Sequence, residues 1–167
     1  SGGAKCWGSN SAGQLGDGST TDRSLPGDVS GLTSGVLAIA TGGMHSCALV
    51  SGGAVRCWGQ NLAGQLGDNT LTQRSLPGAV SGLASGATAL AAGTFHSCAL
   101  LGGALKCWGQ NTYGQLGDNT AERRSTPVGV SGLGSGVATV RAGSLHTCAA
   151  TTGGAAKCWG QNLYAQL

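Results

Sequence analysis

The chain has 167 residues, of which 33 are glycine and only 9% are charged. Disordered chains combine high charge with few apolar groups, so this composition, with 40% hydrophobic residues, predicts a folded protein. The net charge of +3 is too small and too dispersed to suggest nucleic-acid binding. No run of about 18 apolar residues and no signal peptide is visible, so we expect no membrane insertion.

Short strands with a period of two residues follow one another along the chain. The segment near 26–29 is expected to be an edge strand, and residues 36–41 alternate in the pattern of a second strand. Residues 45–50 and 54–59 flank a pair of glycines, which predicts a β-hairpin with a glycine turn. No helical pattern competes, so the chain is expected to be all-β.

Four motifs recur in the same order and phase. Cys-Trp-Gly-x-Asn begins at Cys6, Cys57, Cys107 and Cys158, at intervals of 51, 50 and 51 residues. His-(Ser/Thr)-Cys-Ala begins at His45, His96 and His146, Gly-Gln-Leu-Gly-Asp at Gly13, Gly64 and Gly114, and Arg-Ser-x-Pro at Arg23, Arg74 and Arg124. These repeats divide the chain into a partial unit at 1–17 and three full units at 18–67, 68–117 and 118–167.

Four short strands in each repeat of about 50 residues are typical of a β-propeller blade, and a β-solenoid is the alternative. The combined motifs resemble the regulator of chromosome condensation repeat family in a cysteine-rich, bacterial-type form. The resemblance implies antiparallel four-stranded blades in a propeller that usually has seven of them and is often closed by strands from both termini. We therefore expect about three blades and an overlapping partial blade, as an incomplete ring or a segment of a longer array.

The cysteine spacing predicts one structural disulfide in each full unit. Cysteines on successive strands of a hairpin come within disulfide reach when they face each other, which pairs Cys47 with Cys57, Cys98 with Cys107, and Cys148 with Cys158. Zinc is the alternative, but its clustered ligand spacings are absent, and we expect no metal or other cofactor. Such disulfides indicate an oxidising compartment, so the chain is expected to be extracellular, on the cell surface or periplasmic.

Cys6 has no upstream partner in phase, so it is expected to be unpaired or to form an intermolecular bond. Residues 1–15 repeat the phase of residues 153–167, so both ends carry the same piece of a blade. Three blades and this overlap cannot close a ring. We therefore expect either a segment of a longer protein, or chains that associate through open strand edges as a ring of two or a filament.

Other recurring side chains have structural interpretations. The three histidines are expected to hydrogen-bond backbone groups across strands, and the tryptophans of the Cys-Trp-Gly motif to pack between blades. Asp17, Asp68 and Asp118 show turn chemistry, with calcium binding as the alternative. Lys5, Arg56, Lys106 and Lys157 are expected to form a solvated basic rim, with an acidic partner as the alternative.

No nucleophile elbow, phosphate loop or recurring pair of carboxylates is present, so we expect no enzyme. The sequence favours a non-catalytic, secreted or surface-exposed scaffold for protein interaction. The candidate interaction loops are the positions that vary between units: Thr20, Thr21, Asp22, Leu71, Thr72, Gln73, Ala121 and Glu122.

Three alternatives remain open. The chain could be a self-assembling subunit of an extracellular fibre or coat, because an open-ended contact generates filaments. By resemblance to family members, it could regulate guanine-nucleotide exchange on the Ran small GTPase and bind chromatin. It could also, by the same kind of analogy, inhibit a secreted enzyme such as a β-lactamase. The family's ultraviolet photoreceptor is a poor analogue, because its motif with Trp just before Arg-His is absent here.

Overall fold

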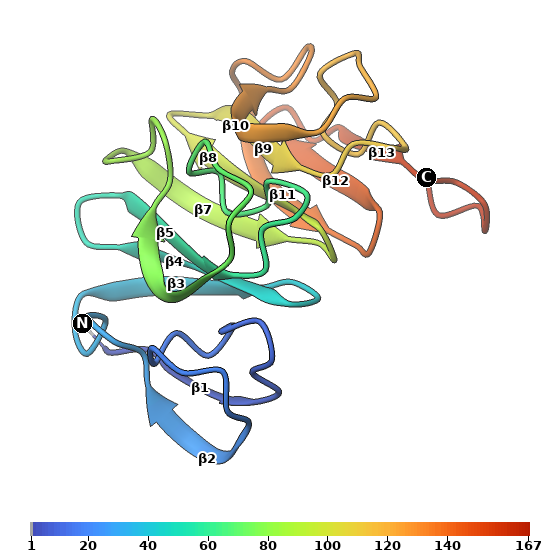
Figure 1. Cartoon of the computed structure of the whole chain (residues 1–167). Helices are drawn as coiled ribbons and strands as arrows, with labels where there is room; N and C mark the ends of the chain where they lie inside the picture. Colours follow the sequence, from blue (N-terminus) through green and yellow to red (C-terminus); the bar gives the residue numbers. More distant parts are fainter. Residues whose placement is uncertain (1) are drawn as a thin grey trace.

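The computed structural model describes residues 2–167, which form four antiparallel sheets and no helix within that range (Figure 1). The first sheet pairs β1 (Lys5–Gly8) with β2 (Arg23–Asp28). The second contains β3 (Val36–Thr41), β4 (His45–Val50), β5 (Ala54–Gly59) and β6 (Arg74–Ala79). The third contains β7 (Ala87–Ala92), β8 (His96–Leu101), β9 (Ala104–Gly109) and β10 (Arg124–Gly129). The fourth contains β11 (Val137–Ala142), β12 (His146–Thr151) and β13 (Ala156–Gly160).

The sheets follow one another like blades, with the first strand of each full sheet innermost (Figure 1). The inner strands β3, β7 and β11 contact one another in sequence. The predicted all-β fold of four-stranded propeller blades is confirmed, and the strands expected at 36–41, 45–50 and 54–59 form where the alternation places them.

The sheets begin and end at different residues from the sequence units. The segment expected near 26–29 is β2, which spans residues 23–28 and pairs with β1 rather than with the strands that follow it. Likewise, β6 pairs with β5, so the boundary expected between residues 67 and 68 lies inside one sheet. The boundary expected between 117 and 118 divides β9 from β10 in the same way. The sheet boundaries differ from the unit boundaries because each Arg-Ser-x-Pro strand forms backbone hydrogen bonds with the strand that precedes it in the chain.

The outermost strand of each sheet tolerates proline because it has no further neighbour. Pro26, Pro77 and Pro127 lie in β2, β6 and β10, and each of these strands is at the edge of its sheet. Proline has no backbone N–H to donate, so it is compatible with an edge strand.

The apolar core lies between neighbouring sheets. One cluster joins Leu49 and Val55 of the second sheet to Trp108 of the third, and another joins Leu100 and Leu105 of the third to Val140 of the fourth. A smaller cluster lies between the first and second sheets. Burial of this kind makes each sheet depend on its neighbours for stability.

A disulfide joins the two strands of each of the hairpins β4–β5, β8–β9 and β12–β13. The bonds are Cys47 to Cys57, Cys98 to Cys107 and Cys148 to Cys158. These are the pairs that the spacing predicts, and each pair is directly opposed in the strand register. Cys6 is unpaired within residues 2–167 and half-buried.

Candidate functional site

Each junction between full sheets is closed by a hydrogen-bonded histidine. His45 Nε2 lies 2.8 Å from Ser97 Oγ in the next sheet, and His96 Nε2 lies 3.0 Å from Thr147 Oγ1. The partner is therefore a side-chain hydroxyl and not the backbone group that the sequence suggests. The difference arises because the imidazole crosses to the neighbouring sheet instead of staying within its own.

The hydroxyl groups fix the histidine tautomer. Ser97 Oγ donates to the carbonyl oxygen of Gln65 at 3.0 Å, so it must accept from His45 Nε2–H. Nδ1 of His45 and of His96 is buried and has no hydrogen-bond partner among residues 2–167. Burial, together with a smaller effect of a neighbouring histidine, lowers the pKa of both imidazoles to about 4. Both rings are neutral at pH 7 and have structural roles.

The buried tryptophans donate hydrogen bonds to glutamine carbonyls that also accept the serine hydroxyls. Trp58 Nε1 donates to Gln14 O at 2.8 Å, and Trp108 Nε1 donates to Gln65 O at 2.9 Å. Both side chains are completely buried between sheets, as the sequence predicts. Trp7, which has the equivalent position in the first sheet, is instead 59% exposed.

The loop that follows each Cys-Trp-Gly motif is organised by a buried asparagine. Asn61 Nδ2 donates to the carbonyl oxygens of Thr70 and Thr72, and its Oδ1 accepts the Leu66 N–H at 3.0 Å. Asn10 and Asn111 are equally buried. Asn10 makes the equivalent three contacts, and Asn111 donates to the Thr120 carbonyl and accepts the Leu116 N–H. The sequence signal for these asparagines is the last position of the Cys-Trp-Gly-x-Asn motif, but the motif alone does not predict their role in the loop.

The recurring aspartates complete the loop frame. Asp68 Oδ1 accepts from the Thr70 N–H and hydroxyl, as turn chemistry predicts, and Oδ2 forms an ion pair with Arg74 at 3.4 Å. Asp17 pairs with Arg23 and Asp118 with Arg124 in the same way.

These hydrogen bonds favour the ionised aspartates. Hydrogen bonds from Ser19 lower the pKa of Asp17 to about 2. Burial opposes ionisation of Asp68 and Asp118, but the hydrogen bonds from Thr70 and Thr120, together with those from the neighbouring arginine and asparagine, outweigh it, so both pKa values are also lowered. Within residues 2–167, no three His, Cys, Asp or Glu side chains gather as metal ligands would.

The candidate interaction loops extend from this frame into solvent. All eight residues named from the sequence are exposed: Thr20, Thr21, Asp22, Leu71, Thr72, Gln73, Ala121 and Glu122. Asp22 also has a structural role, because its carboxylate accepts the Asn10 N–H at 2.7 Å. The exposed Leu62 and Tyr113 lie earlier in the same connections and were not singled out.

These loops share one end of the molecule, which we call the loop end. The turn at 42–44 and the connection at 60–73 lie at the same end of their sheet, because β3 and β5 are both antiparallel to β4. Contacts continue between sheets at this end, where Thr94 Oγ1 lies 2.8 Å from Ser144 Oγ. The loop end is therefore a continuous surface that spans several sheets.

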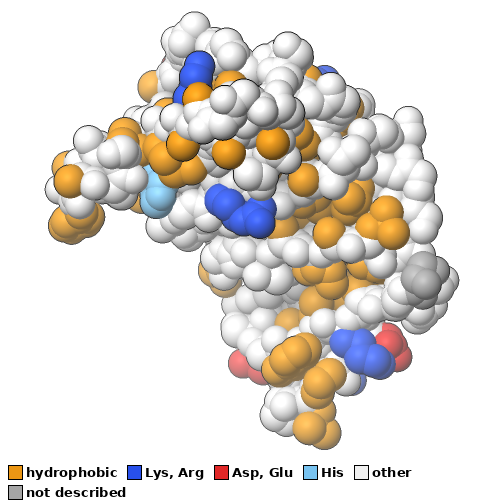
Figure 2. Space-filling view, turned by 180° about the vertical axis from the view of Figure 1, so that it is seen from behind, with side chains coloured by type: hydrophobic (Ala, Val, Ile, Leu, Met, Phe, Trp, Pro, Cys, Tyr) orange, Lys and Arg blue, Asp and Glu red, His pale blue; other side chains and the backbone are white. Residues whose placement is uncertain are grey.

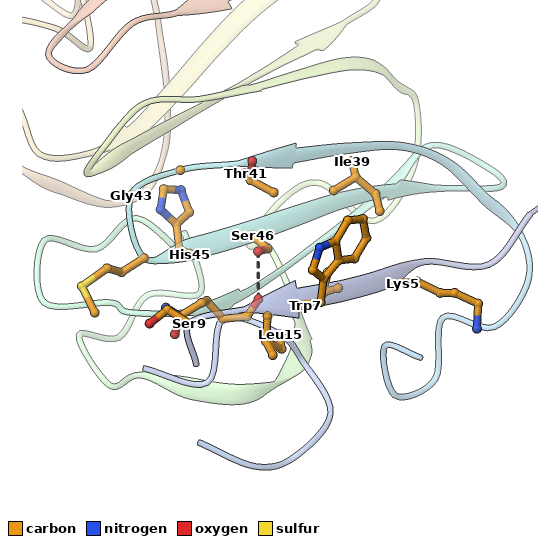
Figure 3. A pocket seen from close by; sticks show the side chains of 13 residues that line it. Lys5, Trp7, Ser9, Leu15, Ile39, Thr41, Gly43, His45 and Ser46 are labelled. Carbon is orange, nitrogen blue, oxygen red and sulfur yellow. Dashed lines mark hydrogen bonds between the residues drawn. The ribbon is translucent and has the colours of Figure 1, made fainter. Parts of the chain in front are cut away.

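A groove of about 460 Å³ lies between the first and second sheets. Figure 3 shows the Trp7 indole extending from β1 toward Ile39 of β3, with His45 and Ser46 further along the wall. Ser46 Oγ donates to Gln14 O at 2.9 Å across the groove floor. The exposed apolar walls distinguish this place from the filled junctions between the later sheets.

The basic position before each motif cysteine is exposed at Lys5, Arg56 and Lys157 and partly buried at Lys106. Lys5 pairs with Asp28 at 2.7 Å, and both side chains are more than half exposed. Arg56, Lys106 and Lys157 have no ion-pair partner among the residues that the structure describes. The back of the molecule carries few charges, scattered among apolar patches (Figure 2).

A family model of the regulator of chromosome condensation (RCC1) repeat matches residues 2–49, 52–100 and 103–150. The chain belongs to the RCC1 repeat family. A second RCC1 model matches residues 36–65, 87–115 and 137–166, ranges that begin at the inner strands of the sheets.

Curated proteins with similar repeats are much longer than this chain. Probable E3 ubiquitin-protein ligase HERC4 from Homo sapiens is 37% identical over 82 residues, which are 48% of this chain and 8% of HERC4. Protein RCC2 homolog from Danio rerio is 41% identical over 71 residues, which are 42% of this chain and 14% of that protein.

Solved RCC1 structures share the fold over nearly the whole chain. Human WBSCR16 has a TM-score of 0.82 at 25% identity, covering 95% of this chain and 42% of that one. Prp20p from Saccharomyces cerevisiae has a TM-score of 0.81 at 27% identity, covering 98% of this chain and 42% of that one. The chain thus spans less than half the length of these propellers.

No helix among the described residues is long and apolar enough to cross a membrane.

Proposed function

We propose that this RCC1-repeat chain is a non-catalytic protein-binding module whose partner contacts the loop end. The observation that carries the proposal is the contrast within the 60–73 connection. Asn61 and Asp68 hold its backbone through side-chain hydrogen bonds, while Leu71, Thr72 and Gln73 are exposed and vary between units. Variable side chains on a fixed frame are suited to recognition.

Related structures support protein binding. Yeast RCC1 (Prp20) has been solved bound to Kap60, and Prp20p has been studied for its binding to Gsp1p and histones. A protein is the proposed class of partner. The exposed loop residues differ from unit to unit, and the loop end presents both apolar and polar groups, as a protein-binding surface does. Leu62, Leu71 and Tyr113 supply the apolar component of this surface.

We place the module in an oxidising compartment, and more specifically outside the cell or in the periplasm. Three disulfides in a chain of this size support the compartment, because cytosolic thiols are kept reduced. Rapid alkylation of protein taken directly from its source would test it. Six blocked cysteines and one reactive cysteine would agree with the proposal, whereas seven reactive cysteines would contradict it.

A comparison of two triple variants tests the binding face. Replacing Leu71, Thr72 and Gln73 by serine should abolish partner binding without lowering the melting temperature. Replacing Arg56, Lys106 and Lys157 by serine should leave the same binding intact, because these residues form the basic rim. If the second variant lost binding and the first kept it, the binding face would be the basic rim and the partner would be acidic.

A further inference from the structure

The junction between the second and third sheets has a further sheet packed on each side. The first sheet packs against the second, and the fourth sheet packs against the third (Figure 1). Side chains that are exposed at this junction are therefore exposed with both neighbouring sheets in place. At the loop end, the connection at 60–73 of the second sheet meets the connection at 110–123 of the third sheet.

Two exposed leucines lie on one fixed stretch of the 60–73 connection. The buried Asn61 side chain donates to the carbonyl oxygens of Thr70 at 3.1 Å and Thr72 at 3.2 Å. Leu71 lies between these two threonines, and Leu62 directly follows Asn61 in the chain. Leu62 is 68% exposed and Leu71 is 40% exposed. Asn61 thus ties together the backbone at both leucines, so a ligand that covers them has little loop ordering to offset.

Arg123 brings a cation to these leucines from the third sheet. Its Nη1 donates to the Leu62 carbonyl oxygen at 3.4 Å across the junction. This is the one side-chain hydrogen bond of Arg123 to any of residues 2–167, although a guanidinium has several N–H donors. Arg123 is exposed and forms no ion pair with a carboxylate in the described chain. Its guanidinium therefore keeps donors for a ligand beside Leu62.

The combination of leucine and arginine is specific to this junction. The residue before the arginine of the Arg-Ser-x-Pro motif is Asp22, Gln73 or Arg123 in the three units. The residue that follows the motif asparagine is Ser11 in the first connection and Leu62 in the second. The junction between the first and second sheets therefore has uncharged polar residues at both equivalent positions.

The other charges near Arg123 are balanced. Asp68 forms an ion pair with Arg74, and Asp118 forms one with Arg124. Glu122 is exposed and, like Arg123, has no ion-pair partner in the described part of the chain. A surface with balanced charge does not attract polyanions over a distance, so its free guanidinium is suited to a single carboxylate held in contact.

We propose that Leu62, Leu71 and Arg123, together called the junction patch, bind a protein segment in which an apolar side chain lies next to a carboxylate. The proposal rests on the proposed function and specifies the chemistry of its partner. The two leucines would cover the apolar side chain. The Arg123 guanidinium would bind the carboxylate, whose oxygens can accept two of its N–H groups at once.

Selection from a random peptide library on the oxidised full chain tests this chemistry. The enriched peptides should place an Asp or Glu within a few residues of a Leu, Ile, Met or Phe. Enrichment of basic peptides, of peptides without a carboxylate or of no peptide at all would overturn the proposal.

A double-mutant cycle with one enriched peptide identifies the contact. Arg123→Gln copies the equivalent Gln73, so it should fold normally and weaken binding about tenfold. Replacing the peptide carboxylate by its amide should weaken binding to the same extent, and both changes together should cost no more than either one alone. Losses that multiply would overturn the proposal, because the carboxylate would then contact another group.

Two further variants test the apolar half of the patch and the specificity of the charge. Leu62→Ser copies Ser11 and should weaken binding of the same peptide about fivefold. Arg56→Gln removes an equal charge from the basic rim and should leave the affinity and the melting temperature unchanged. Equal losses from Arg56→Gln and Arg123→Gln would overturn the proposal, because they would indicate general charge attraction.

The triple serine variant of residues 71–73 separates this proposal from the proposed function. Both that variant and Arg123→Gln should weaken binding of the protein partner. If the triple variant abolishes binding and Arg123→Gln leaves it unchanged, the loop end is the binding face and the junction patch is wrong. If neither variant changes binding, the proposed function fails as well.

Discussion

His45 of one sheet and Ser97 of the next form a hydrogen bond of 2.8 Å that crosses the junction between them. Ser97 passes the interaction on to the Gln65 carbonyl, which also accepts the indole N–H of Trp108. Three different motifs of the repeat therefore meet at a single carbonyl oxygen. The geometry explains why these motifs recur in a fixed phase, because each needs the others at the correct position in the adjacent sheet.

Acid should destabilise the fold through the buried histidines. His45 and His96 have a pKa of about 4 in the folded protein, against 6.5 in the unfolded chain. The unfolded state therefore binds more protons between pH 6.5 and 4, and the free energy of unfolding falls as the pH is lowered through that range. Between pH 7 and 5 the loss should be about 2 kcal/mol for each histidine.

Urea unfolding at these two pH values measures the effect. The His96→Gln variant should lose about half of the acid sensitivity, because one titrating group is removed. Asp17 contributes only at lower pH, since its folded pKa of about 2 lies below the ordinary value of 3.8 and its stabilisation disappears as the pH falls through that interval. Identical stability of the wild type at pH 7 and 5 would be inconsistent with neutral buried imidazoles.

A pair of glycine substitutions should separate backbone strain from steric overlap. Gly67 and Gly82 have nearly the same left-handed conformation, with φ of +69° and +68°. A Cβ at Gly67 would lie 2.7 Å from Trp108 Nε1, whereas a Cβ at Gly82 would meet nothing within 4 Å. We expect Gly82→Ala to cost about 1 kcal/mol from strain and Gly67→Ala about 3 kcal/mol or more.

Chemical denaturation of both glycine variants, followed by tryptophan fluorescence, checks this difference. Gly67→Ala should also shift the emission, because the Trp108 indole must move. Equal losses in the two variants would mean that the loop at Gly67 retreats from the indole without cost.

The sequence predicts local structure here better than contacts between sheets. Alternation and the paired glycines predict the hairpin of β4 and β5, and the cysteine spacing predicts its disulfide, because these features depend on neighbouring residues. The pairing of β6 with β5 depends on a hydrogen-bonded return over the whole 60–73 connection. A periodic sequence can be divided at any phase, so its repeats do not reveal where a sheet begins.

The contacts that organise the candidate site are only partly predictable from the sequence, for a related reason. The turn chemistry of Asp68 is local and was found, but the role of Asn61 requires three backbone groups from different parts of one loop. The hydroxyl partner of His45 is Ser97, which lies 52 residues away in another sheet. The alternation of residues within one strand does not predict contacts with a different sheet.

Removing a central disulfide should destabilise the protein substantially. Replacing Cys98 and Cys107 together by alanine frees a loop of about 10 residues, which the chain-entropy model values at about 3 kcal/mol. Thermal or urea unfolding measures the loss. Cys6→Ala is the matched control and should change stability little in dilute solution, because that thiol is unpaired. A similar loss in both variants would show that thiol packing, and not the cross-link, stabilises the sheets.

Asn61→Asp should open the candidate interaction loop while keeping the size of the side chain. The carboxylate would still accept the Leu66 N–H but could no longer donate to the carbonyls of Thr70 and Thr72. It would also face Asp68, because Asn61 Nδ2 lies 3.2 Å from Asp68 Oδ1. Two carboxylates at that distance repel each other, so the new group should have a raised pKa and be most harmful at neutral pH.

Hydrogen exchange across residues 62–72 measures this opening. At pH 7 the variant should exchange at least tenfold faster there than the wild type, with the strands of the third and fourth sheets unaffected. Below about pH 5 the difference should shrink, since a protonated Asp can donate again. Asn111→Asp makes the same change one sheet further on and should affect only residues 112–122. Loss of protection across the whole chain in either variant would show that the asparagines stabilise the propeller as a unit rather than the individual loops.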